Sequence, residues 1–148
     1  MTKSVRESLV ELSNNKYHIY PTDNVHVYHI YIYPTLKSMY RDGVFIIEMT
    51  ITDRFPLQAP RMRMITNIFH PNVCIEPKHK GMLYLPILYE NWRIPMDIRK
   101  LLDYIYSLFN KPDCDPLAIN NREAYDLYLY YPETFKILAR KFTLKYAQ

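Results

Sequence analysis

The stretch from residue 69 to residue 92 limits the fold more than any other part of this sequence. It carries the motif His70-Pro71-Asn72, then Gly81 and a mostly apolar run over 82–88, and it follows neither helical nor strand periodicity. Residues before it alternate with period two, and residues after it recur with helical spacing. This order is typical of an α+β domain in which the helices are segregated from an antiparallel meander.

Ahead of the irregular stretch, the pattern predicts one short helix and several strands. Val5, Leu9 and Leu12 fall at helical spacing, so residues 3–13 are expected to form an amphipathic helix. Alternation of apolar and aromatic residues then predicts at least three antiparallel strands, over residues 24–32, 44–51 and 61–66.

The chain has only two glycines, so each is expected where the backbone needs unusual freedom. Gly43 closes a turn over residues 39–43 and can supply a positive φ there. Two prolines in the segment 52–60 preclude a central strand.

Three helices are predicted after the irregular stretch. Asp97 is expected to cap the first, which ends near Asn110, where prolines follow. The second is expected over residues 119–130, and Pro132 suits the first turn of a third helix that runs to Tyr146.

The size and composition of the chain indicate one globular domain over residues 1–148. Two cysteines make neither a disulfide framework nor a metal pair, so we expect no metal or cofactor and a reducing cytoplasmic or nuclear location. No stretch is long and apolar enough for a membrane span. The net charge of +4 is spread along the chain, so nucleic-acid binding is disfavoured.

The motifs in the irregular stretch resemble the signature of ubiquitin-conjugating enzymes. In that family the pattern reads H-P-N, a short loop, G-x-I-C-L-D-I-L and a tryptophan, and the cysteine carries ubiquitin as a thioester. Here His70-Pro71-Asn72, Gly81 and Trp92 match this pattern. The resemblance extends over nearly the whole chain and implies the family's α+β fold; further matching segments are residues 40–45, 55–60, 115–117 and 139–147.

The residue at the family's cysteine position departs from the pattern. Tyr84 stands there, Pro86 replaces the aspartate two positions later, and the eight residues Val73 to Lys80 form a longer loop than the family usually has. A phenol with a pKa near ~10 is almost entirely protonated at neutral pH and is a poor acceptor for an acyl group. We therefore expect a catalytically inactive protein, not an enzyme.

Two cysteines offer an alternative to this reading. Cys74 lies in the enlarged loop, and Cys114 lies in a loop that approaches the active cysteine in family members. The alternative is ubiquitin or ubiquitin-like transfer through one of these relocated nucleophiles, although a cysteine without a nearby cation or base is more often inert.

The resemblance also assigns expected roles to polar residues. Asn72 corresponds to the residue that stabilises the oxyanion in active relatives. His70, Pro71 and Asn72 are equally a structural brace, and this is the interpretation we favour. Asp115 resembles the acid that guides the incoming lysine, but an aspartate before proline also forms turns.

The family's docking surfaces predict the residues that bind partners. The first helix of relatives meets the activating enzyme with basic residues, which here include Lys3 and Arg6, while Ser4 and Glu7 weaken that match. The loops that meet ligases correspond to residues 55–60 and 92–95, with the residues Leu57, Trp92, Arg93, Ile94 and Pro95.

The expected function is therefore binding. The sequence predicts a scaffold or regulatory subunit in a ubiquitin-related or other protein complex, with a ligase subunit, an active conjugating enzyme or ubiquitin as partner. Tyrosine occurs 15 times, and Tyr28, Tyr31 and Tyr33 are expected to add amphipathic ring surface for an interface.

Overall fold

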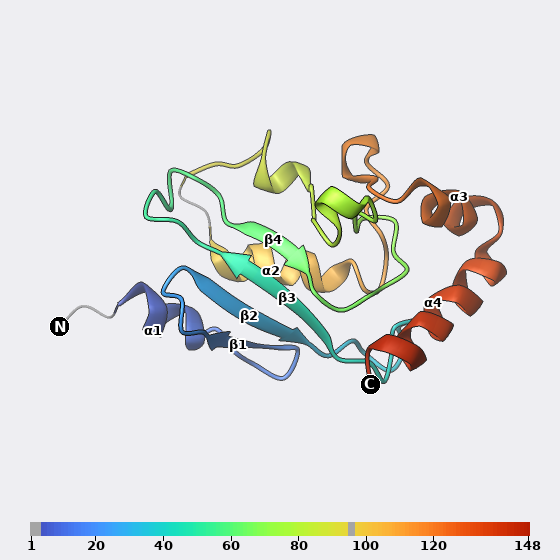
Figure 1. The fold of residues 1–148 in the computed structure, drawn as a ribbon, viewed down its shortest axis with the longest axis horizontal. Helices are drawn as coiled ribbons and strands as arrows, with labels where there is room; N and C mark the ends of the chain where they lie inside the picture. Colours follow the sequence, from blue (N-terminus) through green and yellow to red (C-terminus); the bar gives the residue numbers. More distant parts are fainter. Residues whose placement is uncertain (1–3, 95–96) are drawn as a thin grey trace.

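The structure is a computed structural model that describes residues 4–94 and 97–148. Its helices and strands are arranged around one four-stranded antiparallel sheet of order β1-β2-β3-β4 (Figure 1). The α+β class and the segregation of strands from helices are confirmed. In chain order the elements are α1 (Val5–Val10), β1 (Tyr17–Pro21), β2 (Val27–Ile32), β3 (Phe45–Thr50), β4 (Arg61–Met64), the 3₁₀ turns η1 (Pro77–His79) and η2 (Pro86–Leu88), α2 (Ile98–Ser107), the 3₁₀ turn η3 (Pro116–Ala118), α3 (Arg122–Tyr130) and α4 (Pro132–Tyr146).

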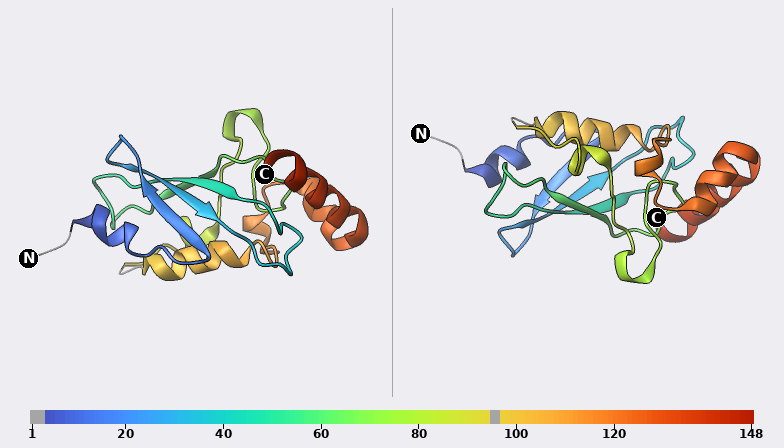
Figure 2. Two further views of the ribbon diagram at one scale, coloured as in Figure 1. Left: turned by 90° about the horizontal axis from the view of Figure 1, so that it is seen from below. Right: turned by 90° about the horizontal axis from the view of Figure 1, so that it is seen from above.

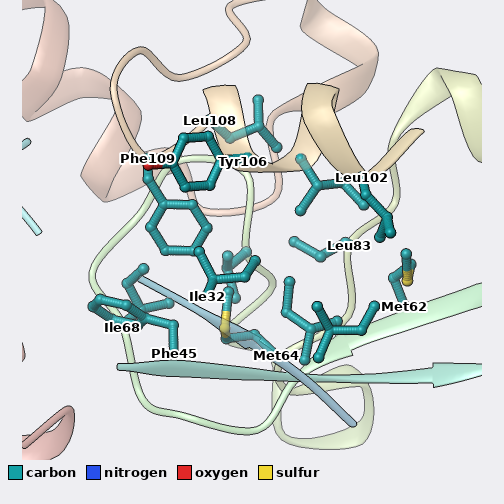
Figure 3. Packing of buried hydrophobic residues seen from close by; sticks show 14 of the residues in the cluster. Ile32, Phe45, Met62, Met64, Ile68, Leu83, Leu102, Tyr106, Leu108 and Phe109 are labelled. Carbon is teal, nitrogen blue, oxygen red and sulfur yellow. The ribbon is translucent and has the colours of Figure 1, made fainter. Parts of the chain in front are cut away.

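The core lies between the sheet and α2. Side chains alternate along β2, so that Tyr28, Ile30 and Ile32 are buried while their neighbours are half-exposed. Figure 3 shows Leu102 of α2 and Leu108 just beyond it facing the side chains of the strands. No described helix covers the middle of the opposite face of the sheet (Figure 2).

The expectation that Tyr28 belongs to an interface is wrong, because its side chain is only 3% exposed and faces the core. Tyr31 and Tyr33 do lie partly exposed. On the open face Tyr31 makes an edge contact with Tyr20 at a centroid distance of 5.0 Å, and Tyr33 makes one with His18 at 5.6 Å. An aromatic cluster therefore lines one side of this face.

The strand β1 was not predicted from the sequence. It is short and pairs with β2 from Tyr17 opposite Ile32 to Pro21 opposite Tyr28. Only Tyr17 and Ile19 of this strand are buried, so the alternation of buried and exposed residues is too short to predict a strand before the proline. A proline that cannot donate to a ladder suits the end of an edge strand.

The first helix is shorter than the predicted range 3–13. Ser4 caps it by accepting a hydrogen bond from the amide of Glu7, and the helix ends at Val10. After it, the Ser13 hydroxyl accepts from the amide of Ile19, and Asn14 accepts from Tyr17. These side chains bond to the backbone of β1 instead of extending the helix.

The other boundaries differ by only a few residues from those predicted. Asp97 caps α2 through the amide of Arg99, as expected. The strand predicted over 24–32 begins at Val27 and ends at Ile32, the one predicted over 44–51 is one residue shorter at each end, and the one predicted over 61–66 ends at Met64. The helix α3 begins at Arg122 rather than 119 because Asn121 caps it. Pro132 begins α4 and the helix ends at Tyr146, as predicted.

The turn before β3 uses its glycine differently from the prediction. The positive φ, 69°, belongs to Asp42, not to Gly43. A Cβ on Gly43 would lie 2.8 Å from both the Phe45 ring and the Thr143 methyl group. Gly43 is therefore needed so that the turn can approach the end of α4.

The two edges of the sheet are closed in different ways. Beyond β4, the amide of Leu83 donates to the carbonyl of Met62 at 3.1 Å, and the amide of Met64 donates to the carbonyl of Gly81 at 2.7 Å. Gly81 has φ 86°, and a Cβ there would lie 2.2 Å from the Met64 carbonyl oxygen. The irregular stretch thus covers one edge, and β1 forms the other.

We expect the substitution Gly43→Ala to destabilise the protein by about 1–3 kcal/mol, because the added methyl group overpacks the contact between the turn and α4. The free energy of unfolding in urea measures this. Leu36→Ala, in the same loop but 82% exposed, is the control and should leave the unfolding midpoint unchanged. Equal midpoints for both variants would contradict the close approach.

Candidate functional site

His70 is buried and bonded on both ring nitrogens. Its Nε2 lies 2.7 Å from the carbonyl oxygen of Leu108, and its Nδ1 accepts from the amide of Asn72 at 3.0 Å. A carbonyl only accepts and an amide only donates, so the ring is neutral with its proton on Nε2. Burial lowers the pKa of His70 to about 4, with the bond to Leu108 opposing the shift.

The side-chain amide of Asn72 is fully engaged. Its nitrogen donates to the carbonyls of Asp113 and Ala118, both at 2.8 Å, and its oxygen accepts from the amide of Asp113 at 2.9 Å. The residue is 0% exposed. Both amide protons are therefore used within the protein, which favours the interpretation of Asn72 as a brace over that of an oxyanion donor.

Pro71 extends this brace to the start of α3. Its carbonyl oxygen accepts from the amides of Asn120 and Asn121 at 2.8 and 3.0 Å. Asn120 in turn donates to the carbonyl of Asn72 at 3.1 Å and to that of Tyr84 at 3.4 Å. The three-residue motif thus joins the irregular stretch to the segment between α2 and α3.

The predicted acid Asp115 is exposed and accepts from the amide of Leu117 at 2.9 Å, which caps η3. This contact is the one expected of a turn former. Asp113, which the sequence analysis did not single out, bonds to the hydroxyl of Tyr104. Burial and this carboxylate raise the pKa of Tyr104 well above its usual value.

Tyr84, which the resemblance assigns to the position of the family's cysteine, is half-buried. Its hydroxyl lies 2.8 Å from Nδ1 of His79, and the two rings meet edge to face at 5.9 Å. His79 belongs to the enlarged loop, and the sequence analysis did not single it out as a partner of Tyr84. The signal was available: this histidine lies among the loop residues that the family pattern lacks.

The two cysteines have different surroundings. Cys74 is buried, and its backbone is held by Met82 and Gly81. Cys114 is exposed in the loop that Asn72 braces through Asp113. Of the two relocated nucleophiles considered, only Cys114 has a thiol that a large acyl donor could reach.

The two predicted ligase-docking loops lie together. The indole nitrogen of Trp92 donates to the carbonyl of Pro56 at 2.9 Å, and the Trp92 and Phe55 rings are 6.4 Å apart. Leu57 is 74% exposed and Ile94 is 51% exposed, so neither covers its own core. Arg93 is exposed and donates to the carbonyls of Glu90 and Trp92, while Pro95 lies outside the described residues.

On the first helix, Arg6 is half-buried and its guanidinium donates to the carbonyl of Thr22 at 2.7 Å. Lys3 lies outside the described residues. Within residues 4–94 and 97–148, no group of three or more His, Cys, Asp or Glu side chains could hold a metal ion. No helix in this part of the chain has the length and apolar character needed to cross a membrane.

We expect His70 to make stability depend on pH. Because its pKa falls from 6.5 to about 4 on folding, the unfolded chain binds the proton first, and stability is lost as pH drops from about 6.5 towards 4. The loss attributable to this group is roughly 3 kcal/mol. His70→Gln should be less stable at neutral pH, and its difference from the native protein should shrink across this window. Urea midpoints at several pH values test this; parallel curves would refute it.

Tyr84→Phe removes the hydroxyl bonded to His79, so we expect faster hydrogen exchange at the amides of His79 and Met82, with a loss of stability below about 1 kcal/mol. Tyr89→Phe is the matched control, since no hydrogen bond of its hydroxyl is found among the described residues. Unchanged exchange in Tyr84→Phe would show that this bond does not hold the loop.

The sequence of this chain is similar to those of known proteins. A model of the family described as ubiquitin-conjugating enzyme matches residues 1–143. The chain is 34% identical over 127 residues to ubiquitin-conjugating enzyme E2 13 of Saccharomyces cerevisiae, covering 85% of this chain and 78% of the relative. It is 31% identical over 126 residues to ubiquitin-conjugating enzyme E2 N of Drosophila melanogaster, covering 84% and 79%.

These comparisons correct one expectation. The sequence analysis inferred from Tyr84 that the chain is not an enzyme, but the relatives are named as enzymes and no observation demonstrates a loss of activity. The replacement of one side chain identifies a departure from the family's pattern, not its effect on activity. The match over residues 1–143, together with the fold and the intact His70-Pro71-Asn72 motif, shows that the chain belongs to the ubiquitin-conjugating enzyme family.

Proposed function

We propose that this chain takes part in ubiquitin conjugation by binding protein partners, as a scaffold or regulatory subunit. The observation that carries the proposal is the apolar surface formed by Leu57 and Ile94, which we call the loop patch. Both side chains are more than half exposed, although each belongs to a loop that is otherwise anchored. Exposed aliphatic side chains on a fixed backbone are suited to fill a pocket in a partner.

The anchoring of the loop patch supports a binding role. Trp92 is bonded to Pro56 and packs near Phe55, so the two loops are held to each other before any partner arrives. A surface organised in advance loses less conformational entropy on binding. In the family, ligases bind these two loops, so a ligase subunit is the partner that we expect at the loop patch.

The aromatic cluster on the open face of the sheet supports a second contact. Tyr20 is 46% exposed and packs against Tyr31, and His18 stacks on Tyr20 at 6.0 Å. Rings with an apolar body and a polar tip are enriched at protein interfaces. This face is available for ubiquitin or an active conjugating enzyme while the loop patch is occupied.

The exposed thiol of Cys114 favours one further candidate function, transfer of ubiquitin or a ubiquitin-like protein through a thioester. The step is an exchange in which the Cys114 thiolate attacks the carbonyl carbon of the thioester on an activating enzyme, and the activating enzyme's thiolate leaves. Cys74 is a weaker candidate because burial excludes a large donor.

For the binding proposal, we expect Leu57→Glu to weaken partner binding by at least about tenfold, because a charge would replace an apolar anchor. The measurement is the dissociation constant for immobilised RING-type ligase domains, ubiquitin and an active conjugating enzyme. Leu36→Glu, at a leucine that is 82% exposed and belongs to neither of the two loops, is the control. Absence of binding to every probe, or equal losses in both variants, would reject the loop patch.

For the transfer candidate, the protein is incubated with activating enzyme, ATP and ubiquitin and run on reducing and non-reducing gels. A thiol-sensitive adduct on the native protein and on Cys74→Ser, lost in Cys114→Ser, is the result expected of Cys114 as acceptor. Tyr84→Cys restores the family's residue and serves as the positive control. An adduct that persists in Cys114→Ser would exclude this candidate.

A further inference from the structure

A groove of about 630 Å³ runs between the segment 37–41 and the outer face of α4. We call it the α4 groove. Its lining residues on α4 run from Glu133 to Leu144, and α4 lies at the end of the molecule opposite to the segment 55–60 (Figure 1). None of its lining residues belongs to the His70-Pro71-Asn72 brace, the loop patch or the aromatic cluster, so the proposed function does not account for it.

The floor of the α4 groove is aliphatic. Met39 is half-buried, while Ile137 and Leu144 of α4 are 65% and 56% exposed. Ile137 and Leu144 are seven positions apart and therefore lie on the same face, two turns or about 10 Å along the helix axis. Neither side chain points into the core that Phe135 and Ala139 occupy.

The rim of the α4 groove is positively charged. Five of its side chains are cationic and only Glu133 is anionic, and Glu133 is already paired with Lys136 at 3.4 Å. The five cations are Lys37, Arg41, Lys136, Arg140 and Lys141.

Arg140 bonds to the opposite wall of the groove. The Arg140 guanidinium donates to the carbonyls of Met39 and Arg41 and lies 3.7 Å from the Asp42 carboxylate, so it fixes the two walls of the groove to each other. Lys37, Arg41 and Lys141 have no carboxylate partner among the described residues. The Arg41 guanidinium also donates to the carbonyl of Ser38 at 3.3 Å, so the groove has a braced frame, and these three cations carry charge that no described carboxylate neutralises.

The chemistry of this surface selects one kind of partner. A nucleic acid would satisfy the cations, but no aromatic side chain lines the groove for base stacking, and Ile137 and Leu144 would face a phosphate backbone. A helix with apolar residues at i, i+3 or i+4 and i+7 covers both aliphatic side chains, and acidic residues on its flanks reach the rim. We propose that the α4 groove binds an acidic amphipathic helix of a partner protein.

The test uses a dye-labelled helical peptide of about 15 residues, with leucines at helical spacing and glutamates on the flanks. Fluorescence anisotropy with the intact protein measures its dissociation constant. A peptide with lysines in place of the glutamates, and a single-stranded oligonucleotide of equal charge, are the comparison ligands. We expect only the acidic peptide to bind and its affinity to fall as salt rises.

Two kinds of variant separate charge from apolar contact. The double change Lys37→Glu with Lys141→Glu should weaken peptide binding at least about tenfold, and Ile137→Ala should weaken it about fivefold. Lys100→Glu, an equally exposed reversal on α2, is the matched control and should have no effect. All of these positions are exposed, and circular dichroism checks that each variant is folded.

The proposal is overturned if the acidic peptide fails to bind at low salt, or if Lys100→Glu weakens binding as much as the double change. Equal binding of the oligonucleotide with no dependence on Ile137 would also overturn it and indicate a nucleic-acid surface. Because no residue of the loop patch is changed, failure here leaves the binding proposal for Leu57 untouched.

Discussion

The side-chain amide of Asn72 is the interaction on which the site depends. It bonds to the backbone of Asp113 twice and to that of Ala118 once, and these partners lie more than forty positions later in the chain. Asn72 and Ala118 are buried and Asp113 is half-buried, so losing the amide would leave the Ala118 carbonyl without this donor, at a cost of about 1–3 kcal/mol. The irregular stretch is thereby fixed to the end of α2, although it has little regular structure of its own.

This brace explains how the motif can persist beside an altered acceptor position. His70 ties Asn72 to Leu108, and Pro71 ties it to the start of α3, so each residue of the motif has a structural partner. Stability alone therefore favours the side chains of His70 and Asn72, whatever happens at Tyr84, while Pro71 contributes its backbone carbonyl. The presence of the motif identifies the family but does not identify the chemistry, which has to be sought at Tyr84, His79 and Cys114.

Strong periodicity and a recognised family pattern made most of the fold predictable. The helix from Pro132 to Tyr146 and the cap at Asp97 follow from local rules, and the structure has both. What failed depended on distant partners. The need for a glycine at 43 arises from Thr143, a hundred positions away, and the strand β1 is defined by its pairing with β2. No local pattern contains those contacts.

The candidate site was predictable in part for the same reason. The pattern located Asn72 and Tyr84. It could not show that both amide protons of Asn72 are bonded within the protein or that His79 contacts Tyr84, because these contacts form only when the loop is folded. Burial likewise separates Cys74 from Cys114, the two alternatives that the sequence offered. The sequence named Leu57 and Ile94 as partner-binding residues, but their exposure and the bond from Trp92 to Pro56 that joins the two loops are seen only in the folded chain.

The closure of the β4 edge has a consequence for self-association. Because residues 81–83 supply hydrogen bonds to β4, the backbone groups on that side are not free to template a strand from another molecule. The remaining edge, β1, is five residues long, ends in a proline and has α1 packed beside it. A protein with an aromatic-rich open sheet face can thus offer that face to partners while its edges resist strand-by-strand aggregation.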